Sequence, residues 1–240
     1  AVVVSSGVMW SLEVKRGLLE HMPQAMLSDA FSSSEALGMG SSIMTRTGEV
    51  QTATFTIGER CRVFDETDQP VAPGSGVRGV VALGPPNPVG YYKDEEKTAR
   101  TFRVIDGVRY SMPGDWCIVE ADGTLTLLGR GNACINTAGE KVFPEEVEEA
   151  LKTHPSVRDA VVVGVPDPRF GERICAVVEV DPTAPQPSLE EMAGHVRSRL
   201  AAYKAPRELV VVPSIGRAPN GKVDYKASRD RALAALGVGA

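Results

Sequence analysis

The sequence predicts a chain of mixed α/β and α+β class, because the pattern of its elements changes twice along its length. Residues 1–45 read as a buried strand followed by a helix, which is typical of the end of a larger α/β sheet. Residues 46–131 contain short strands and frequent turns, which favour a small antiparallel β-barrel subdomain. Residues 132–240 alternate helices and strands over a normal domain size, which predicts a compact α+β domain. We therefore place the main domain boundary between residues 131 and 132.

The first part begins with a predicted parallel strand at residues 2–4, which are all valine. Ser11 is expected to cap a helix whose apolar positions include Leu12, Leu18 and Leu19. A strand at the edge of a sheet exposes unpaired backbone groups. The predicted partners therefore include a second copy of the chain, through self-association or in a homo-oligomer.

In the middle part, turn residues between short apolar runs predict short antiparallel strands. Asp122 and Gly123 indicate a hairpin, since this dipeptide tolerates the positive φ of a tight turn. Polar residues 65–70 and the proline-rich residues 84–88 end two earlier strands. The strands predicted here are residues 60–64, 77–83, 117–120 and 124–127.

In the last part, Pro144 occupies the first turn of a predicted helix, where proline is tolerated. Glu145, Glu146 and Glu148 place negative charge near the N-terminus of this helix. Further helices are expected after Ser188 and after residue 223. The strands predicted in this part are residues 160–165, 174–180 and 209–212.

Composition excludes several classes of function. The net charge of −5 provides no broad basic surface for nucleic acid or anionic lipid. No apolar run reaches the length of a transmembrane segment. The four cysteines and three histidines lack the spacing of a zinc site, so we interpret the cysteines as buried thiols in a reducing cytoplasm.

Four motifs carry the chemistry. They are Phe-Ser-Ser-Ser-Glu at residues 31–35, Tyr-Ser-Met-Pro-Gly-Asp at 110–115, the stretch 129–148 that begins Gly-Arg-Gly-Asn, and Pro-Asn-Gly-Lys at 219–222. Alone, the first fits a polar loop, the second a turn aspartate and the last a solvated turn. Their order and approximate spacing resemble the later half of an adenylate-forming enzyme, and most of all a bacterial fatty-acyl-CoA synthetase. Such enzymes activate a carboxylic acid with ATP and transfer the acyl group to coenzyme A.

Within this resemblance, residues 1–131 correspond to the C-terminal part of the AMP-binding N-terminal domain, and residues 132–240 to the mobile C-terminal domain. The Ser/Thr/Gly-rich phosphate loop that family members carry upstream does not occur in the sequence. We therefore expect the chain to be a fragment that does not turn over by itself.

The resemblance assigns the nucleotide site to the first two motifs. Phe31 would offer a flat surface to adenine, Ser34 a hydroxyl near the α-phosphate, and Glu35 a carboxylate for the Mg²⁺ of ATP. Asp115 would accept hydrogen bonds from the ribose hydroxyls. The other residues assigned to the nucleotide are Asp29, Ser33 and Arg130.

The resemblance assigns the hinge, the coenzyme A tunnel and the catalytic lysine to the last two motifs. Asn132 would be the hinge of the C-terminal domain, where family members usually have Asp or Lys. Ala138, Gly139 and Glu140 would line the tunnel for the pantetheine of coenzyme A. Lys222 would be the catalytic cation, brought to the α-phosphate only in the adenylation state.

Two alternatives stay open at this point. An acyl-AMP ligase or carrier-loading adenylation enzyme would share the first half-reaction, and a non-catalytic nucleotide-binding or partner-binding module would share the fold. Similarity to synthetases that activate lipids and steroid side chains points to a large hydrophobic acid. The sequence upstream of the first residue would distinguish the module from the enzyme, since only the enzyme needs a phosphate loop.

Overall fold

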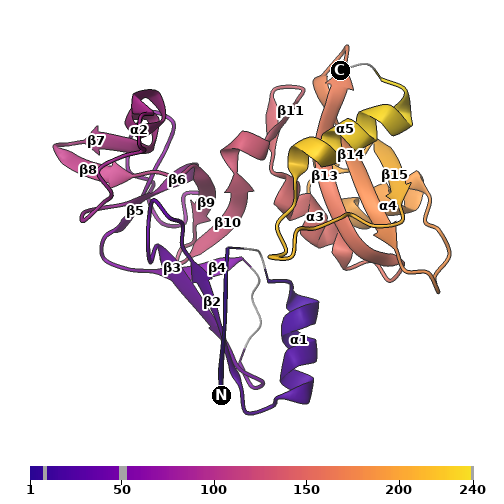
Figure 1. Cartoon of the computed structure of the whole chain (residues 1–240), viewed down its shortest axis with the longest axis horizontal. Coiled ribbons are helices and arrows are strands. Elements are labelled where there is room, and N and C mark those ends of the chain that lie inside the picture. The colour runs from indigo at the N-terminus through magenta and orange to yellow at the C-terminus, as the bar shows by residue number, and fades with distance from the viewer. Residues whose placement is uncertain (8–9, 49–52, 239–240) are drawn as a thin grey trace. The chain divides into compact units, whose positions relative to one another are not determined.

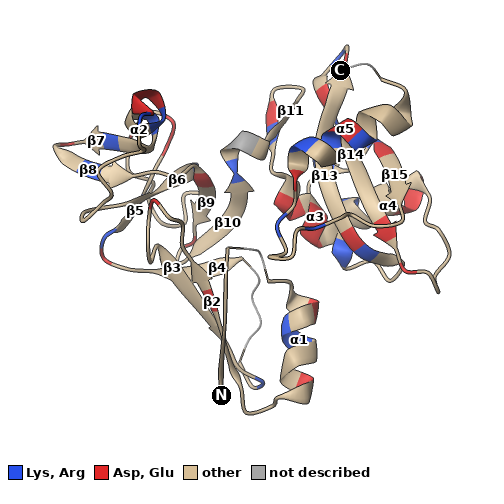
Figure 2. Ribbon diagram, in the orientation of Figure 1, with Lys and Arg blue, Asp and Glu red and all other residues tan. Residues whose placement is uncertain are grey.

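The computed structural model describes residues 1–7, 10–48 and 53–238, and it divides the chain into two compact units (Figure 1). Unit 1 comprises Ala1–Leu128 and unit 2 comprises Gly129–Ala240. Mixed α/β structure is present throughout, as the sequence predicted. Figure 2 shows acidic and basic residues interspersed along both units, in keeping with the small net charge.

Unit 1 begins with an α/β layer. Strand β1 (Val2–Ser6) pairs in parallel with β2 (Met26–Phe31), and β3 (Gly40–Met44) and β4 (Thr54–Ile57) continue the sheet with antiparallel pairing. Helix α1 (Leu12–His21) is capped by the Ser11 side chain, which accepts a hydrogen bond from the Val14 amide at 3.4 Å. The first strand and the Ser11-capped helix are thus confirmed.

One face of this layer is covered by α1 and the other is open within unit 1. Leu19 of α1 packs against Leu27 and Met44 of the sheet. On the opposite face, Val4 and Ile43 both flank Ser28 in neighbouring strands, and their exposed fractions are 65% and 60%. The apolar residues of this face therefore gain little burial from unit 1 itself.

The antiparallel part of unit 1 is also confirmed, with two additions. Its strands are β5 (Cys61–Phe64), β6 (Arg78–Leu83), β7 (Phe102–Ile105), β8 (Val108–Ser111), β9 (Asp115–Val119) and β10 (Leu125–Arg130), whose last two residues belong to unit 2. The β7–β8 hairpin and α2 (Glu95–Thr101) were not predicted. Among the described residues the strand pairings follow an open path from β1 to β7, with β5 attached to β6, so the sheet does not close into the expected barrel.

Unit 2 is built on a five-stranded sheet with helices on both faces. Its strands are β11 (Ile135–Thr137), β12 (Glu140–Val142), β13 (Val157–Asp167), β14 (Gly171–Val180) and β15 (Glu208–Val212). Its helices are α3 (Pro144–Lys152), α4 (Leu189–Arg197) and α5 (Tyr225–Leu236), with short 3₁₀ turns η1 (Gly131–Ala133) and η2 (Ala202–Lys204). Pro144 and Ser188 begin helices as predicted.

The side chains of the long β13–β14 pair alternate between two apolar cores. Val162 lies in the core that Leu151 of α3 and Met192 of α4 cover, whereas Val161 and Leu233 of α5 lie in the core on the opposite face. Because strand side chains alternate in direction, neighbouring valines of one run fill both cores. The continuous apolar character of this strand follows from burial on both faces.

Three of the four cysteines are buried, as predicted, and Cys134 is half-buried. Burial raises the pKa of the Cys61 thiol to about 11 and those of Cys117 and Cys175 to about 12. No group of His, Cys, Asp or Glu among the described residues forms a metal site by itself. In the same part of the chain, no helix is long and apolar enough to cross a membrane.

Candidate functional site

The aromatic residue of the first motif lies inside the core of unit 1. Phe31 is the last residue of β2, and its ring packs against Phe55 with centroids 5.3 Å apart. Only 7% of Phe31 is exposed. Within unit 1, little of the ring is therefore open to an adenine, and its nucleotide role stays a prediction.

The loop after β2 turns back on itself through its serines. The Ser32 hydroxyl accepts a hydrogen bond from the Gly38 amide at 2.7 Å, and the Ser33 hydroxyl accepts one from the Ala36 amide at 3.1 Å. Both contacts fix the backbone on either side of Ser34 and Glu35. The motif therefore forms an ordered turn, in which serine hydroxyls accept hydrogen bonds from backbone amides of the same loop.

Glu35 is held by Tyr91, which sequence reasoning missed, and by Ser111, a motif residue to which it had assigned no role. The Tyr91 hydroxyl donates to Glu35 Oε1 at 2.5 Å, and the Ser111 hydroxyl donates to the Glu35 backbone oxygen at 2.6 Å. Ser111 belongs to the same predicted motif as Asp115, which begins β9 and is 5% exposed. The two halves of the predicted nucleotide site are therefore joined through Ser111.

Glu35 also fits the expected Mg²⁺ in its chemistry. Mg²⁺ prefers oxygen ligands and is often held by one or two carboxylates together with substrate phosphates. Glu35 offers such a carboxylate on an ordered turn, and Tyr91 fixes one of its oxygens. Most of the remaining ligands would come from ATP and water.

Asp29 is engaged with helix α1. Its Oδ2 lies 3.1 Å from Lys15 Nζ, and the two side chains are only 7% and 3% exposed. Burial raises the pKa of Asp29, and the nearby Lys15 charge and hydrogen bond oppose that rise. This ion pair connects α1 to β2, so Asp29 stabilises the packing of the helix on the sheet. Its nucleotide contact stays a prediction.

Gly129 and Arg130, the Gly-Arg pair of the third motif, both lie against the Glu145 carboxylate at the start of unit 2. A Cβ at Gly129 would lie 2.1 Å from the Glu145 carboxylate, and Gly129 has a φ of +144°. The Glu145 side chain could move away from such a Cβ, whereas the positive φ favours glycine at this position. The next residue, Arg130, donates its amide to Glu145 Oε1 at 3.2 Å, and Asn132 follows in η1; the Asn132 side chain lies outside the described atoms.

Ala138 and Gly139, which the resemblance assigned to the coenzyme A tunnel, form the tip of the β11–β12 hairpin. Ala138 and Gly139 have φ of 53° and 84° between β11 and β12, and Glu140 begins β12. The Ala138 amide donates to the Phe170 carbonyl at 3.0 Å, which braces the tip against the loop between β13 and β14. Nothing lies within 4 Å of a Cβ built on Gly139, so the tip is open on that side.

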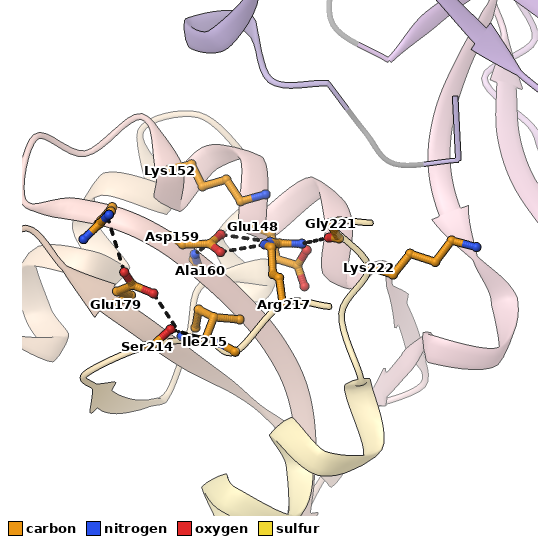
Figure 3. A network of polar contacts seen from close by, with 12 residues as sticks. Glu148, Lys152, Asp159, Ala160, Glu179, Ser214, Ile215, Arg217, Gly221 and Lys222 are labelled. Atoms are coloured by element: carbon orange, nitrogen blue, oxygen red, sulfur yellow. Dashed lines mark hydrogen bonds and ion pairs between the residues drawn. The ribbon is translucent and has the colours of Figure 1, made fainter. Parts of the chain in front are cut away.

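Lys222 lies on a tight turn with an exposed side chain, which points away from the polar network beside it (Figure 3). The Ala218 amide donates to the Lys222 carbonyl at 3.0 Å, and the Gly221 amide donates to the Ala218 carbonyl at 2.8 Å. The Lys222 amide donates to Asn220 Oδ1 at 3.1 Å. This arrangement presents an amine on a structured support.

A buried carboxylate that no motif predicted as functional lies beneath this turn. Glu148 of α3 is 4% exposed and accepts hydrogen bonds from the Val162 amide at 2.9 Å and the Tyr225 hydroxyl at 3.3 Å. Burial raises the pKa of Glu148 to about 7, against the lowering effect of those hydrogen bonds. Sequence reasoning had used Glu148 as charge near the start of a helix and as the last position of the third motif, without assigning it a role of its own.

The fold and these motifs define the C-terminal portion of an adenylate-forming enzyme. Residues 146–222 match the family of the AMP-binding enzyme C-terminal domain. Residues 146–222 thus belong to this domain family, and the similarity to adenylate-forming enzymes extends upstream of the matched domain, as the relatives show.

Two curated relatives are similar over nearly the whole chain. The medium/long-chain-fatty-acid–CoA/3-oxocholest-4-en-26-oate–CoA ligase of Mycobacterium marinum is 49% identical over 96% of the chain. The 3-oxocholest-4-en-26-oate–CoA ligase of Rhodococcus rhodochrous is 47% identical over 95%. The chain spans only 42% and 41% of the lengths of these two relatives.

Solved structures agree with the fold. ATP-bound MatB from Rhodopseudomonas palustris has a TM-score of 0.79 at 26% identity, covering 95% of this chain and 44% of that one. The amide bond synthetase McbA from Marinactinospora thermotolerans has a TM-score of 0.78 at 28% identity, covering 95% and 46%. The predicted class of protein is thereby confirmed.

Proposed function

We propose that the complete protein containing this chain activates a hydrophobic carboxylic acid with ATP and transfers the acyl group to coenzyme A. The observation that carries the proposal is the similarity to CoA ligases over 96% of the chain. The local geometry supports it, since an ordered carboxylate at Glu35 and a presented amine at Lys222 match the two charges that adenylation requires.

In the first half-reaction a carboxylate oxygen attacks the α-phosphorus of ATP, and the bond to pyrophosphate breaks. Negative charge builds on the non-bridging oxygens of the α-phosphate during this step. A Lys222 ammonium placed there would stabilise the transition state more than bound ATP, which raises kcat. Mg²⁺ held partly by Glu35 would neutralise charge on the phosphates.

In the second half-reaction the C-terminal domain turns about Asn132, which withdraws Lys222 and brings the Gly139 hairpin tip to the adenylate. The coenzyme A thiol loses its proton, its sulfur attacks the acyl carbonyl, and AMP leaves with the electrons of the broken C–O bond. One site then serves two steps in sequence. The open space beside Gly139 supports a passage for a narrow substrate arm.

The acid that we propose is large and hydrophobic, and the location is the cytoplasm, where ATP and coenzyme A are available. The names of the relatives include medium- and long-chain fatty acids and a steroid side-chain acid. Incubation of the complete reading-frame product with ATP, Mg²⁺ and such acids should release pyrophosphate, and adding coenzyme A should give the acyl thioester. Pyrophosphate release without any thioester would instead favour an acyl-AMP ligase or a carrier-loading enzyme. Absence of both products, with nucleotide still bound, would favour a binding module.

The hinge assignment leads to a prediction for Asn132→Pro in the complete reading-frame product. Proline fixes φ near −65° and removes an amide donor, so the joint should lose freedom to rotate. We expect the thioester step, measured from supplied acyl-adenylate, to slow more than adenylate formation, measured as pyrophosphate release.

Asn132→Ala, which removes the same side chain without fixing φ, is the matched control. Equal slowing of the two half-reactions by Asn132→Pro would contradict the hinge assignment. The same conclusion would follow if limited proteolysis cut within residues 150–210 instead of near Asn132.

A further inference from the structure

An arginine connects the turn that carries Lys222 to the sheet. Arg217 Nε and Nη2 donate to Asp159 Oδ2 and Oδ1 at 2.6 and 2.8 Å, a bidentate contact with strand β13 (Figure 3). The side chains of Arg217 and Asp159 are 25% and 20% exposed. Hydrogen bonds between charged groups in two parallel contacts are stronger and more directional than single ones.

A third donor of the same guanidinium reaches the residue that precedes Lys222. Arg217 Nη1 donates to the Gly221 carbonyl oxygen at 3.1 Å. This oxygen belongs to the same planar peptide group as the Lys222 amide, which donates to Asn220 Oδ1. Together with the hydrogen bond from the Ala218 amide to the Lys222 carbonyl, fixing that plane restricts the backbone of Lys222 and hence the direction of its Cα–Cβ bond.

The other hydrogen bonds of the turn described above are local, because they join residues 218, 220, 221 and 222 to one another. They maintain the shape of the turn, while the Arg217–Asp159 contact sets its orientation on β13. The charge and hydrogen bonds of Arg217 also hold the pKa of Asp159 below its usual range, although burial opposes this. Asp159 therefore stays ionised as the partner of Arg217 at neutral pH.

From this geometry we infer that Arg217 is a positioning residue for Lys222. It clamps the Gly221–Lys222 peptide to Asp159, so that the ammonium of Lys222 is oriented before the domain closes. The inference rests on the proposed adenylation role of Lys222 and adds a residue that acts only through it. Lysine cannot replace this arginine, because an ammonium lacks the planar fork that reaches a carboxylate and a carbonyl together.

The test compares Arg217→Lys, Arg217→Ala, Lys222→Ala and the double variant Arg217→Ala/Lys222→Ala in the complete reading-frame product. Adenylation is measured by ATP–pyrophosphate exchange, and the thioester step from supplied acyl-adenylate. A misplaced catalytic group commonly costs one to two orders of magnitude in rate. We therefore expect Arg217→Lys to lower the kcat of adenylation about tenfold, with the KM for ATP within about twofold and the thioester step nearly unchanged.

The double variant separates positioning from general stability. If Arg217 acts through Lys222, the double variant is no slower in adenylation than Lys222→Ala alone. Arg231→Lys is the matched control, since Arg231 also donates to a backbone carbonyl, that of Ser214 at 2.8 Å, which lies outside the turn. This control should retain wild-type adenylation.

Three results would overturn the inference. They are an unchanged adenylation rate in Arg217→Lys, an equal loss in both half-reactions, or losses that multiply in the double variant. If Lys222→Ala itself adenylates at the wild-type rate, the proposed role of Lys222 fails and the inference fails with it. If Lys222→Ala slows adenylation while Arg217→Lys does not, only the positioning role of Arg217 is rejected.

Discussion

Lys222→Ala is expected to lower adenylate formation by about 10²–10³, the usual effect of removing one electrostatic stabiliser of a transition state. The exposed amine is held on a turn closed by the Ala218 amide and the Lys222 carbonyl at 3.0 Å, so the deletion should leave the turn intact. The thioester step from supplied acyl-adenylate should proceed at close to the wild-type rate, because the proposed domain rotation has already withdrawn Lys222.

Lys226→Ala is the matched control for this experiment. Lys226 is an exposed lysine four positions further on, in helix α5, and it lies outside the turn. Its replacement should leave both half-reactions unchanged. Parallel losses in both steps for Lys222→Ala would assign Lys222 a role in folding or in binding rather than in adenylation.

Glu148→Gln is expected to change how the stability of unit 2 depends on pH. The pKa of Glu148 rises from 4.5 to about 7 on folding, mainly through burial. The folded state therefore binds this proton more tightly than the unfolded state does. The resulting stabilisation is complete below pH 4.5 and is lost as pH rises through 7. In wild type this amounts to up to about 3 kcal/mol of unfolding free energy.

Glutamine removes the ionisation and keeps the shape of the side chain. Its oxygen can still accept from the Val162 amide, and its amide group can donate to the Tyr225 hydroxyl oxygen. The difference in unfolding free energy between wild type and Glu148→Gln should thus shift in favour of the variant between pH 5 and 8. Comparing the two proteins cancels the titration of the groups that they share.

Urea unfolding of residues 129–240 across this pH range measures the effect, with Glu190→Gln on α4 as the control for removing a carboxylate. Unit 2 has its own two apolar cores, which supports using it alone. A difference between wild type and Glu148→Gln that does not vary with pH would show that Glu148 is not protonated preferentially in the folded protein.

Local signals allowed much of the fold to be predicted. Ser11, Pro144 and Ser188 each begin a helix because their preference acts within one turn of the chain. The Ala138–Gly139 tip was named by the resemblance and not by a local signal, and the structure gives both residues a positive φ. Helix α2 was missed because its sequence is polar except for Ala99 and shows no apolar period.

The supports of the candidate site could not be predicted in the same way. Asp159 and Arg217 are 58 positions apart, and Glu35 and Tyr91 are 56 apart. Such pairs form only after the sheets have assembled, and no local preference marks them. The motif residues themselves were found because the resemblance named them, whereas the burial of Phe31 against Phe55 depends on packing that a motif does not contain.

The distribution of the thiols has a practical consequence for following the motion of this chain. Thiol reagents react with the thiolate, and burial disfavours that form at Cys61, Cys117 and Cys175. Cys134 is half-buried and lies two residues after the proposed hinge at Asn132. A maleimide fluorophore at neutral pH should therefore attach at Cys134 without replacement of any cysteine of this chain. In the complete reading-frame product, its emission would then report the proposed rotation about Asn132 in real time.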